Sequence, residues 1–595
     1  MKIRKIRSII GTILTVAVIS TTVTGCGISF QPGIIKSESA TVIGDLPADP
    51  GPAQNEAADE PEAYTDELSA CTEEPEACTE EAEECETIFF TSSKKQNLSD
   101  GSYLDGLYDY NAPSEQYDTN DNTEEYSELK EMGYLSVKNH PLSTFAADVD
   151  TASYSNLRRL INEGYGLGDF PEGSVRIEEM LNYFDYDYTG PKKSEPFGVN
   201  TEIVRCPWNE DALLLGIGLK TEDIDFGSTP PSNLVFLIDV SGSMADYDKL
   251  PLLQDAFCML ADELSEKDRV SIVTYADGVD TVLKGATGDE KKKIKRAIRS
   301  LNPSGATNGG EGIQTAYRLA EKNFIKGGNN RIILATDGDL NLGITDVDDL
   351  HDLISDKKES GIYLSVLGFG TGNIKDNRME TLADNGNGNY SYIDSVREAK
   401  KVLVDELSSN MLTVCKDVKF QAEFNSDVVK GYRLLGYANR VMKDRDFDDD
   451  KKDGGEIGAG HELTVLYEII PQKKYSADRI NKKCADEELL TLAIRYKTPS
   501  GTKSDLLEYP ITFENFTERP SEDIMFQSAV AEFGLLASDS LFSGEADIDN
   551  VIERLESLSF EDEYKEEFYK MVVSASQYNY GFYNEDIDYE DTICR

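Results

Sequence analysis

The sequence predicts an α/β protein built on a doubly wound, mostly parallel β-sheet, inserted in or flanked by an antiparallel β-sandwich and followed by a C-terminal helical segment. Three patterns lead to this prediction. Within residues 230–411, short apolar stretches alternate with amphipathic helical stretches, as in a parallel sheet covered by helices. On either side of this region, apolar and polar residues alternate, which predicts half-buried antiparallel strands. From 521 to 578, the apolar residues recur at helical spacing.

The start of the chain has the features of an exported protein. Residues 1–25 combine a basic start, an apolar stretch at 9–20 and small residues before Cys26. They predict a secretory signal, because the apolar stretch is shorter than the roughly 20 residues that span a bilayer. Val23-Thr24-Gly25-Cys26 resembles the bacterial lipobox, which implies cleavage before Cys26 and lipid (palmitate) attachment to its thiol. The alternative is an ordinary signal followed by a chance cysteine.

Residues 26–135 are expected to form a disordered acidic tether, because they are rich in Glu, Asp, Ser, Pro and Gly and have few apolar clusters to bury. A seven-residue repeat contains Cys71, Cys78 and Cys85, but it includes proline and lacks two apolar positions per heptad. A duplication in an unconstrained linker is therefore favoured over a coiled coil. The net charge of −52 argues against nucleic acid as a partner, since binding phosphates needs a basic face.

The next region, 136–229, contains two predicted helices, at 151–163 and 175–183. An Asp-x-Asp-Thr-x-Ser motif at the start of the first helix imitates a metal-binding motif. Helix capping by Asp150 and Thr151 is the favoured interpretation, because Asp and Thr accept hydrogen bonds from free N–H groups at helix starts.

The remaining elements follow from the same patterns. In the central region, strands are predicted at 234–240, 270–275, 332–335, 363–368 and 390–393, and helices at 249–265, 291–301, 312–322 and 396–412. Antiparallel strands are predicted at 201–204, 213–219, 418–424, 463–469, 489–496 and 506–512. Residues 412–595 are expected to be β-rich and then helical, with helices at 548–557 and 561–574. Strands before and after the central region are expected to pair, so that this region interrupts the sandwich.

Oxygen-bearing side chains gather where two of the predicted parallel strands end. Asp239, Ser241 and Ser243 follow one buried strand, Asp337 follows another, and Thr307 lies in a glycine-rich loop between them. Ligands of open α/β sheets bind at the carboxyl ends of the strands. Carboxylate and hydroxyl oxygens suit Mg²⁺, Mn²⁺ or Ca²⁺. The alternative is that Asp-x-Ser-x-Ser merely caps a helix.

These five residues, in this order, resemble the metal-ion-dependent adhesion site of von Willebrand factor type A (VWA) domains, which have a Rossmann-like fold. The resemblance implies that Ser241, Ser243 and, in the ligand-bound state, Thr307 contact the ion directly. It implies that Asp239 and Asp337 act largely through waters. It also implies an ion that lacks one ligand, which an Asp or Glu side chain of a protein partner supplies. Mg²⁺ is the expected ion, with Mn²⁺ and Ca²⁺ as alternatives.

The resemblance extends beyond the metal site. Residues 141–188 resemble the N-terminal extension found in one bacterial group of VWA proteins. Residues 432–437, 455–461 and 529–534 resemble the C-terminal region of the same group. The likeness covers most of the chain from about residue 136, but it implies no reaction, because these flanking regions are of uncharacterised function.

The sequence thus predicts a surface protein, lipid-anchored to a bacterial membrane on its extracytoplasmic side, that binds a protein partner through a divalent-metal-dependent adhesion site. It does not predict an enzyme. The histidines, His140, His351 and His461, are scattered, and no Gly-x-Ser-x-Gly elbow surrounds Ser241 or Ser243. Two alternatives stay open: a metal-dependent hydrolase that uses the same ion, and an assembly protein whose flanking regions carry the interface.

Overall fold

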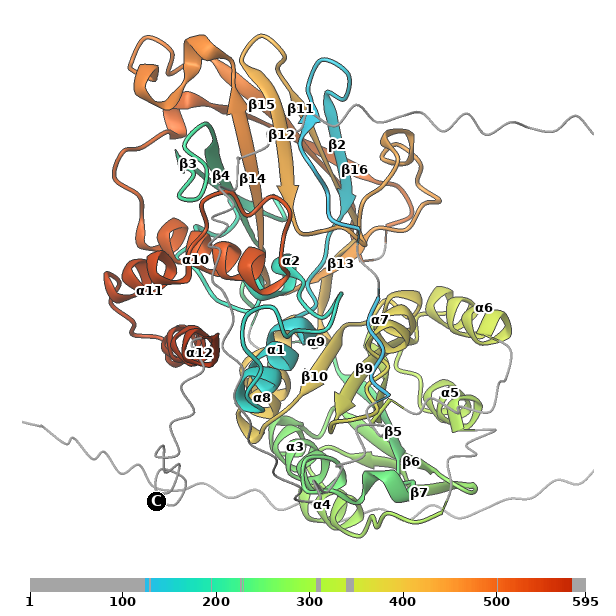
Figure 1. Cartoon of the computed structure of the whole chain (residues 1–595). Helices are drawn as coiled ribbons and strands as arrows, with labels where there is room; N and C mark the ends of the chain where they lie inside the picture. Colours follow the sequence, from blue (N-terminus) through green and yellow to red (C-terminus); the bar gives the residue numbers. More distant parts are fainter. Residues whose placement is uncertain are drawn as a thin grey trace, which may run out of the picture. The chain divides into compact units, whose positions relative to one another are not determined.

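The computed structural model describes residues 123–127, 130–193, 195–224, 227, 229–305, 312–338, 347–499 and 501–579 (Figure 1). Residues 1–25, Cys26, the tether as far as residue 122 and Thr307 lie outside this part. The described residues form three β-sheets with helices packed against them.

The central sheet has six strands, in the order β10-β9-β8-β5-β6-β7. All neighbouring pairs are parallel except β6 and β7. The strands are β5 (Ser232–Asp239), β6 (Arg269–Tyr275), β7 (Val279–Thr287), β8 (Asn329–Thr336), β9 (Tyr363–Phe369) and β10 (Tyr390–Ile393). The predicted mostly parallel sheet is confirmed, and all of β5 is buried, as expected of a strand covered on both faces. The edge strand β7 was not predicted, because its residues alternate irregularly between buried and exposed.

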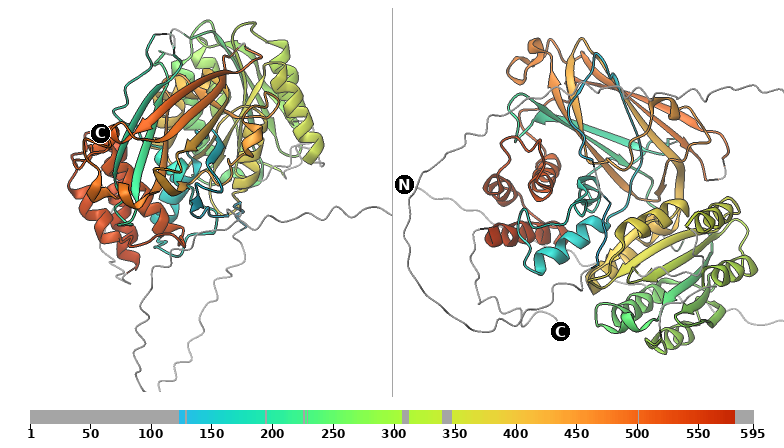
Figure 2. Two further views of the ribbon diagram at one scale, coloured as in Figure 1. Left: turned by 90° about the horizontal axis from the view of Figure 1, so that it is seen from above. Right: turned by 45° about the vertical axis from the view of Figure 1, so that its right-hand side comes forward.

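Helices cover both faces of this sheet, as the right-hand view of Figure 2 shows. They are α3 (Leu250–Glu263), α4 (Lys291–Arg299), α5 (Gly312–Lys322), α6 (Val347–Glu359) and α7 (Asp376–Asn385). One hydrophobic cluster packs α3 and α4 on the sheet, and another packs α5 and α7. Phe236 of β5 stacks on Phe257 of α3, with ring centroids 4.4 Å apart. The carboxyl ends of the strands are therefore held by packing on both faces. The sequence did not predict α6 and α7.

The prediction of one continuous closing helix at 396–412 is wrong, because a π-helical turn interrupts the helix. It consists of α8 (Val396–Lys400), the π-helical turn η3 (Lys401–Asp405) and α9 (Leu407–Met411). In η3 the N–H of Glu406 donates to the carbonyl of Lys401 at 2.8 Å, a spacing of five residues. The Lys401 side chain, whose ammonium lies 4.7 Å from the centre of the Tyr183 ring, also bonds Glu406. This wider turn brings the two charged side chains together.

The flanking strands form two antiparallel sheets, β1-β12-β14-β4-β3 and β13-β11-β15-β16, with β2 paired to β11. Their bounds are β1 (Leu135–Ser136), β2 (Leu142–Ala146), β3 (Gly198–Arg205), β4 (Leu213–Lys220), β11 (Thr413–Phe424), β12 (Val429–Leu435), β13 (Gly455–Gly458), β14 (Glu462–Pro471), β15 (Glu488–Lys497) and β16 (Asp505–Thr512). A hydrophobic cluster between the sheets joins them into a sandwich. β4, which precedes the central region, pairs with β14, which follows it. The expected interruption of the sandwich is confirmed.

A separate helical layer packs around Trp208, the only tryptophan of the chain. It contains α1 (Ala152–Asn162), α2 (Ile177–Leu181), α10 (Glu522–Ala537), α11 (Ile548–Glu556) and α12 (Glu563–Asn579). The capping interpretation at the start of α1 is wrong, because Thr151 makes no side-chain cap. Asp150 instead accepts a hydrogen bond from the Tyr390 N–H at 2.9 Å, and Glu179 accepts one from the Ser153 N–H at 2.8 Å. Hydrogen bonds to distant parts of the chain, rather than helix capping, therefore engage the Asp150 carboxylate and the Ser153 N–H.

Within the described ranges, no helix is both long enough and apolar enough to cross a membrane. Cys206, Cys258, Cys415 and Cys484 are free and buried.

Candidate metal centre

Asp239, Ser241 and Ser243 lie on the turn that leaves the carboxyl end of β5. Asp239 is fully buried, and its Oδ1 accepts a hydrogen bond from the Ser241 N–H at 2.8 Å. This local bond bends the chain into the short 3₁₀ helix η2 (Gly242–Ala245). The hydroxyl oxygens of Ser241 and Ser243 come within 2.9 Å of one another. The turn therefore places two hydroxyls directly after a buried carboxylate.

Asp337 reaches the same edge from β8. This strand runs parallel to β5, with Ile238 opposite Ala335, so the residues that follow the two strands emerge side by side. Asp337 is buried, and the neighbouring Thr336 Oγ1 lies 3.5 Å from Oδ2 of Asp239. Four of the five predicted metal residues are thus brought together at one edge of the sheet.

The glycine-rich loop is tied to this turn by two backbone hydrogen bonds. The Ser304 N–H donates to the Val240 carbonyl at 2.8 Å, and the Gly242 N–H donates to the Gly305 carbonyl at 3.0 Å. Gly305 has φ of +81°, a left-handed conformation that favours glycine, and a Cβ there would also lie 2.3 Å from Oδ2 of Asp277. Thr307 follows Gly305 by two residues but lies outside the described residues. The direction in which its side chain points is therefore still a prediction.

Asp337 has one oxygen engaged and one unused. Its Oδ2 accepts from the ammonium of Lys249 at 3.0 Å. Among the described residues, its buried Oδ1 has no hydrogen-bond partner. Because an unpaired buried carboxylate oxygen is costly, this atom is well suited to bind a ligand. Carboxylate and hydroxyl oxygens are the donors that Mg²⁺ prefers, so the residues present fit a divalent cation.

The carboxylates also affect a neighbouring tyrosine. Burial, together with the negative charge of Asp239, raises the pKa of Tyr275 well above its usual value. The Tyr275 hydroxyl therefore stays neutral. Lys249 was missed in the sequence, because a lysine at the start of an amphipathic helix is ordinarily exposed, and no local pattern indicates that it reaches Asp337.

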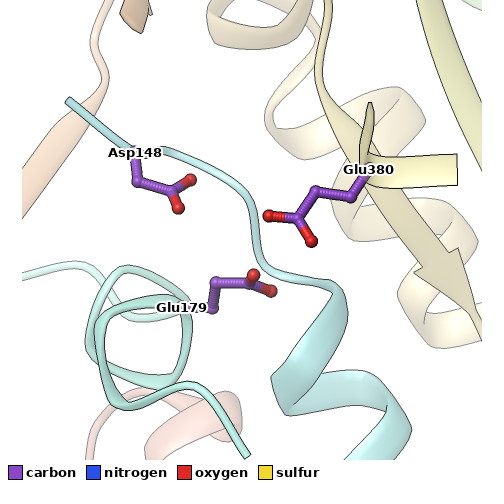
Figure 3. Close-up of side chains that lie close together, drawn as sticks. All are labelled: Asp148, Glu179 and Glu380. Atoms are coloured by element: carbon purple, nitrogen blue, oxygen red, sulfur yellow. The ribbon is translucent and has the colours of Figure 1, made fainter. Parts of the chain in front are cut away.

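A second group of carboxylates lies outside the central sheet edge. Asp148, Glu179 and Glu380 are buried, and one oxygen from each lies within 4.8 Å of the others (Figure 3). They come from the segment before α1, from α2 and from α7. Arg176, which is buried, and Arg440, which is 14% exposed, already neutralise part of this charge. The Nε of Arg440 donates to Asp148 at 2.8 Å, and Arg176 bonds Glu179.

This cluster is best described as an ion-pair network that joins the flanking region to the central one. Arg176 donates to Asp376 of α7 at 2.7 Å, and Arg440 donates to Asp384 at 2.6 Å. Burial raises the pKa of Glu179 to about 8, which is the expected effect of removing a carboxyl group from water. The cluster resembles a metal site only in the proximity of its carboxylates.

Comparisons with known proteins identify families for most of the described part of the chain. The von Willebrand factor type A domain matches residues 233–405, the C-terminal region of the uncharacterized protein YfbK matches 409–578, and a further von Willebrand factor match covers 120–216. The chain is 42% identical over 431 residues to YfbK of Escherichia coli (strain K12), which covers 70% of this chain and 74% of YfbK.

More distant relatives share parts of the chain. It is 27% identical over 256 residues to inter-alpha-trypsin inhibitor heavy chain H3 of Mesocricetus auratus, covering 40% of this chain but only 29% of that relative. A solved structure, von Willebrand factor type A from Catenulispora acidiphila, is 16% identical with a TM-score of 0.37, covering 65% of this chain and 91% of that one. On the match to YfbK, the chain belongs to the family of this bacterial VWA protein and carries both a VWA domain and the YfbK C-terminal domain.

Proposed function

We propose that this protein binds an acidic side chain of a protein partner through a divalent cation, by preference Mg²⁺, at the carboxyl edge of the central sheet. Ser241, Ser243 and Thr307 would contact the ion, and Asp239 and Asp337 would hold its waters. The observation that carries the proposal is the buried Asp337 Oδ1, which has no partner among the described residues and lies at the edge that also presents Asp239 and the two hydroxyls. When bound, the ion supplies positive charge that attracts a carboxylate.

An exposed aromatic beside this edge supports a protein as the partner. Tyr247 lies four residues after Ser243, in the loop between η2 and α3, and it is 86% exposed. Tyrosine contributes large, rigid contact area and is enriched among the residues that anchor protein interfaces. A partner that inserts a carboxylate at the metal would bring its neighbouring residues against this ring.

The proposal includes no catalytic step. The hydroxyls of Ser241 and Ser243 bond one another and so are not arranged as an activated nucleophile with its base. His461 precedes β14 of the sandwich, and burial lowers its pKa to about 4, which keeps it neutral. A binding role is therefore favoured over the hydrolase alternative.

The lipid anchor is part of the same proposal and is supported by the sequence alone. Export signalled by residues 1–25, followed by lipid attachment at Cys26, would hold the protein on the extracytoplasmic side of a bacterial membrane. The acidic residues that follow would let the VWA domain reach a partner away from the membrane surface.

The metal step is tested first, by calorimetric titration of Mg²⁺, Mn²⁺ and Ca²⁺ into the parent protein and into the Asp239→Ala/Ser241→Ala variant. We expect the parent alone to bind metal. Linkage then predicts that Mg²⁺ at 100 times its Kd raises the free energy of unfolding of the parent by about 2.7 kcal/mol and leaves that of the variant unchanged. Asp289→Ala/Ser300→Ala removes the same two kinds of group from exposed positions and should behave as the parent does. Equal metal binding by a folded Asp239→Ala/Ser241→Ala variant would refute the site.

The partner step uses a peptide that carries a glutamate and its glutamine counterpart. We expect binding of the glutamate peptide in Mg²⁺, and loss of that binding in chelator or with glutamine. Binding of both peptides without metal would instead support the assembly role of the flanking regions.

A further inference from the structure

Lys249 places a buried positive charge within the proposed metal centre. Its ammonium lies 3.0 Å from Oδ2 of Asp337, and the two side chains are only 7% and 0% exposed. Asp239, the other metal-site carboxylate, is also fully buried. The lysine is therefore fixed beside the site by burial and by its ion pair, unlike an exposed lysine with a freely moving side chain.

Two separate elements hold this side chain in place. The backbone of Lys249 begins α3, where its N–H donates to the Asp246 carbonyl at 3.1 Å and its carbonyl accepts from the Leu253 N–H at 2.8 Å. The aliphatic part of the side chain lies against Gly370, which follows β9. Gly370 has φ of +76°, and a Cβ there would lie 2.3 Å from Cε and 2.4 Å from Cγ of Lys249. A residue other than glycine would displace the lysine, so the loop after β9 leaves space for it.

The charge of Lys249 has opposite effects with and without metal. Without the ion, it offsets the repulsion between two buried carboxylates. With the ion, a divalent cation whose waters Asp337 would hold lies near the Lys249 ammonium, and the two positive charges repel each other. Their repulsion at such short range is large enough to weaken metal binding by about tenfold or more.

We propose that Lys249 is an internal counter-cation of the metal centre, which opposes binding of the divalent ion by charge repulsion and makes metal binding depend on the partner. The partner's carboxylate adds the negative charge that the lysine has cancelled. Metal and partner therefore strengthen each other's binding, because the coupling between two ligands is reciprocal. This inference rests on the proposed function of the same site.

The test removes the charge and keeps the aliphatic chain, in Lys249→Met. We expect its calorimetric Kd for Mg²⁺, measured without any partner, to fall by about tenfold or more relative to the parent. We also expect its thermal midpoint in chelator to fall, because Asp337 loses its counter-ion. Lys293→Met, which removes an exposed lysine paired with Glu290 on α4, is the matched control and should change neither value.

The possible outcomes distinguish a failure of this inference from a failure of the proposed function on which it rests. If the parent binds Mg²⁺ and Lys249→Met binds it equally or more weakly, Lys249 does not oppose metal binding, while the metal centre itself stands. If neither protein binds Mg²⁺, Mn²⁺ or Ca²⁺, the metal-dependent function fails and the inference fails with it. If Lys249→Met does not fold, Lys249→Gln keeps a neutral donor towards Asp337, and the same fall in Kd is expected.

Discussion

Removing Arg158 should destabilise the packing between the VWA domain and the helices beside it. Arg158 belongs to α1 and is 4% exposed. Its guanidinium bonds Asp394 at 2.5 and 2.8 Å and Glu398 at 2.7 Å, both beside the end of the central sheet. It also bonds Glu567 of α12 at 2.9 Å. One side chain therefore joins three segments that are far apart in the sequence.

The expected cost follows from what Arg158→Met leaves behind. Glu398 is fully buried, and its pKa is already raised by burial even though Arg158 lowers it. Without the guanidinium, this carboxylate must stay buried and unpaired or take up a proton. Breaking a buried ion pair from one side costs about 3–5 kcal/mol. We therefore expect the variant to lose that amount of unfolding free energy at pH 7, with a smaller loss in Arg158→Met/Glu398→Gln.

Trp208 provides the assay for this loss. It is the only tryptophan and is fully buried in the same hydrophobic cluster as Tyr154 and Tyr183, the rings beside Arg158. Its fluorescence during urea denaturation therefore reports on this region. Arg299→Met is the control, because Arg299 pairs with Asp255 where the side chains are 50% and 48% exposed, and such pairs contribute about 0–1 kcal/mol. An equally small effect of Arg158→Met would refute the argument.

Two other predictions concern pH and the anchor. Burial, then the charge of Asp148, raises the pKa of Glu178 to about 7 from the usual 4.5, so the folded state binds more protons between these values. The stability due to this group is full below pH 4.5 and is lost as pH rises through 7. Glu178→Gln should therefore reduce the pH dependence of the free energy of unfolding, measured by urea denaturation between pH 5 and 7, by up to about 1.4 kcal/mol per pH unit. An unchanged slope would contradict this assignment. Cys26→Ala should move the protein from the membrane fraction to the soluble fraction and remove the lipid mass seen by mass spectrometry, whereas retention in the membrane would exclude the anchor.

Much of the central fold could be predicted from the sequence, because its information is local. The central residues of β5 and β8, 234–238 and 332–335, are apolar without interruption, and burial on both faces of a parallel strand demands this pattern. The side chains that follow such strands must emerge at the sheet's carboxyl edge. This is why the sequence alone predicts that Asp239 and Asp337 lie together. The alternating strands on both sides of the central region likewise predicted pairing across it, and the structure shows that β4 and β14 are the strands that pair.

Tertiary structure alone decided which charged side chains meet. Lys249 reaches Asp337, 88 residues away, and Arg158 reaches Glu567, 409 residues away. The edge strand β7 and the π-turn of η3 likewise depend on neighbours rather than on their own periodicity. Hydrophobic periodicity records only which face of an element is buried. A buried charge, in contrast, is stable only beside a specific opposite charge, and the chain's path in space determines whether that partner is present.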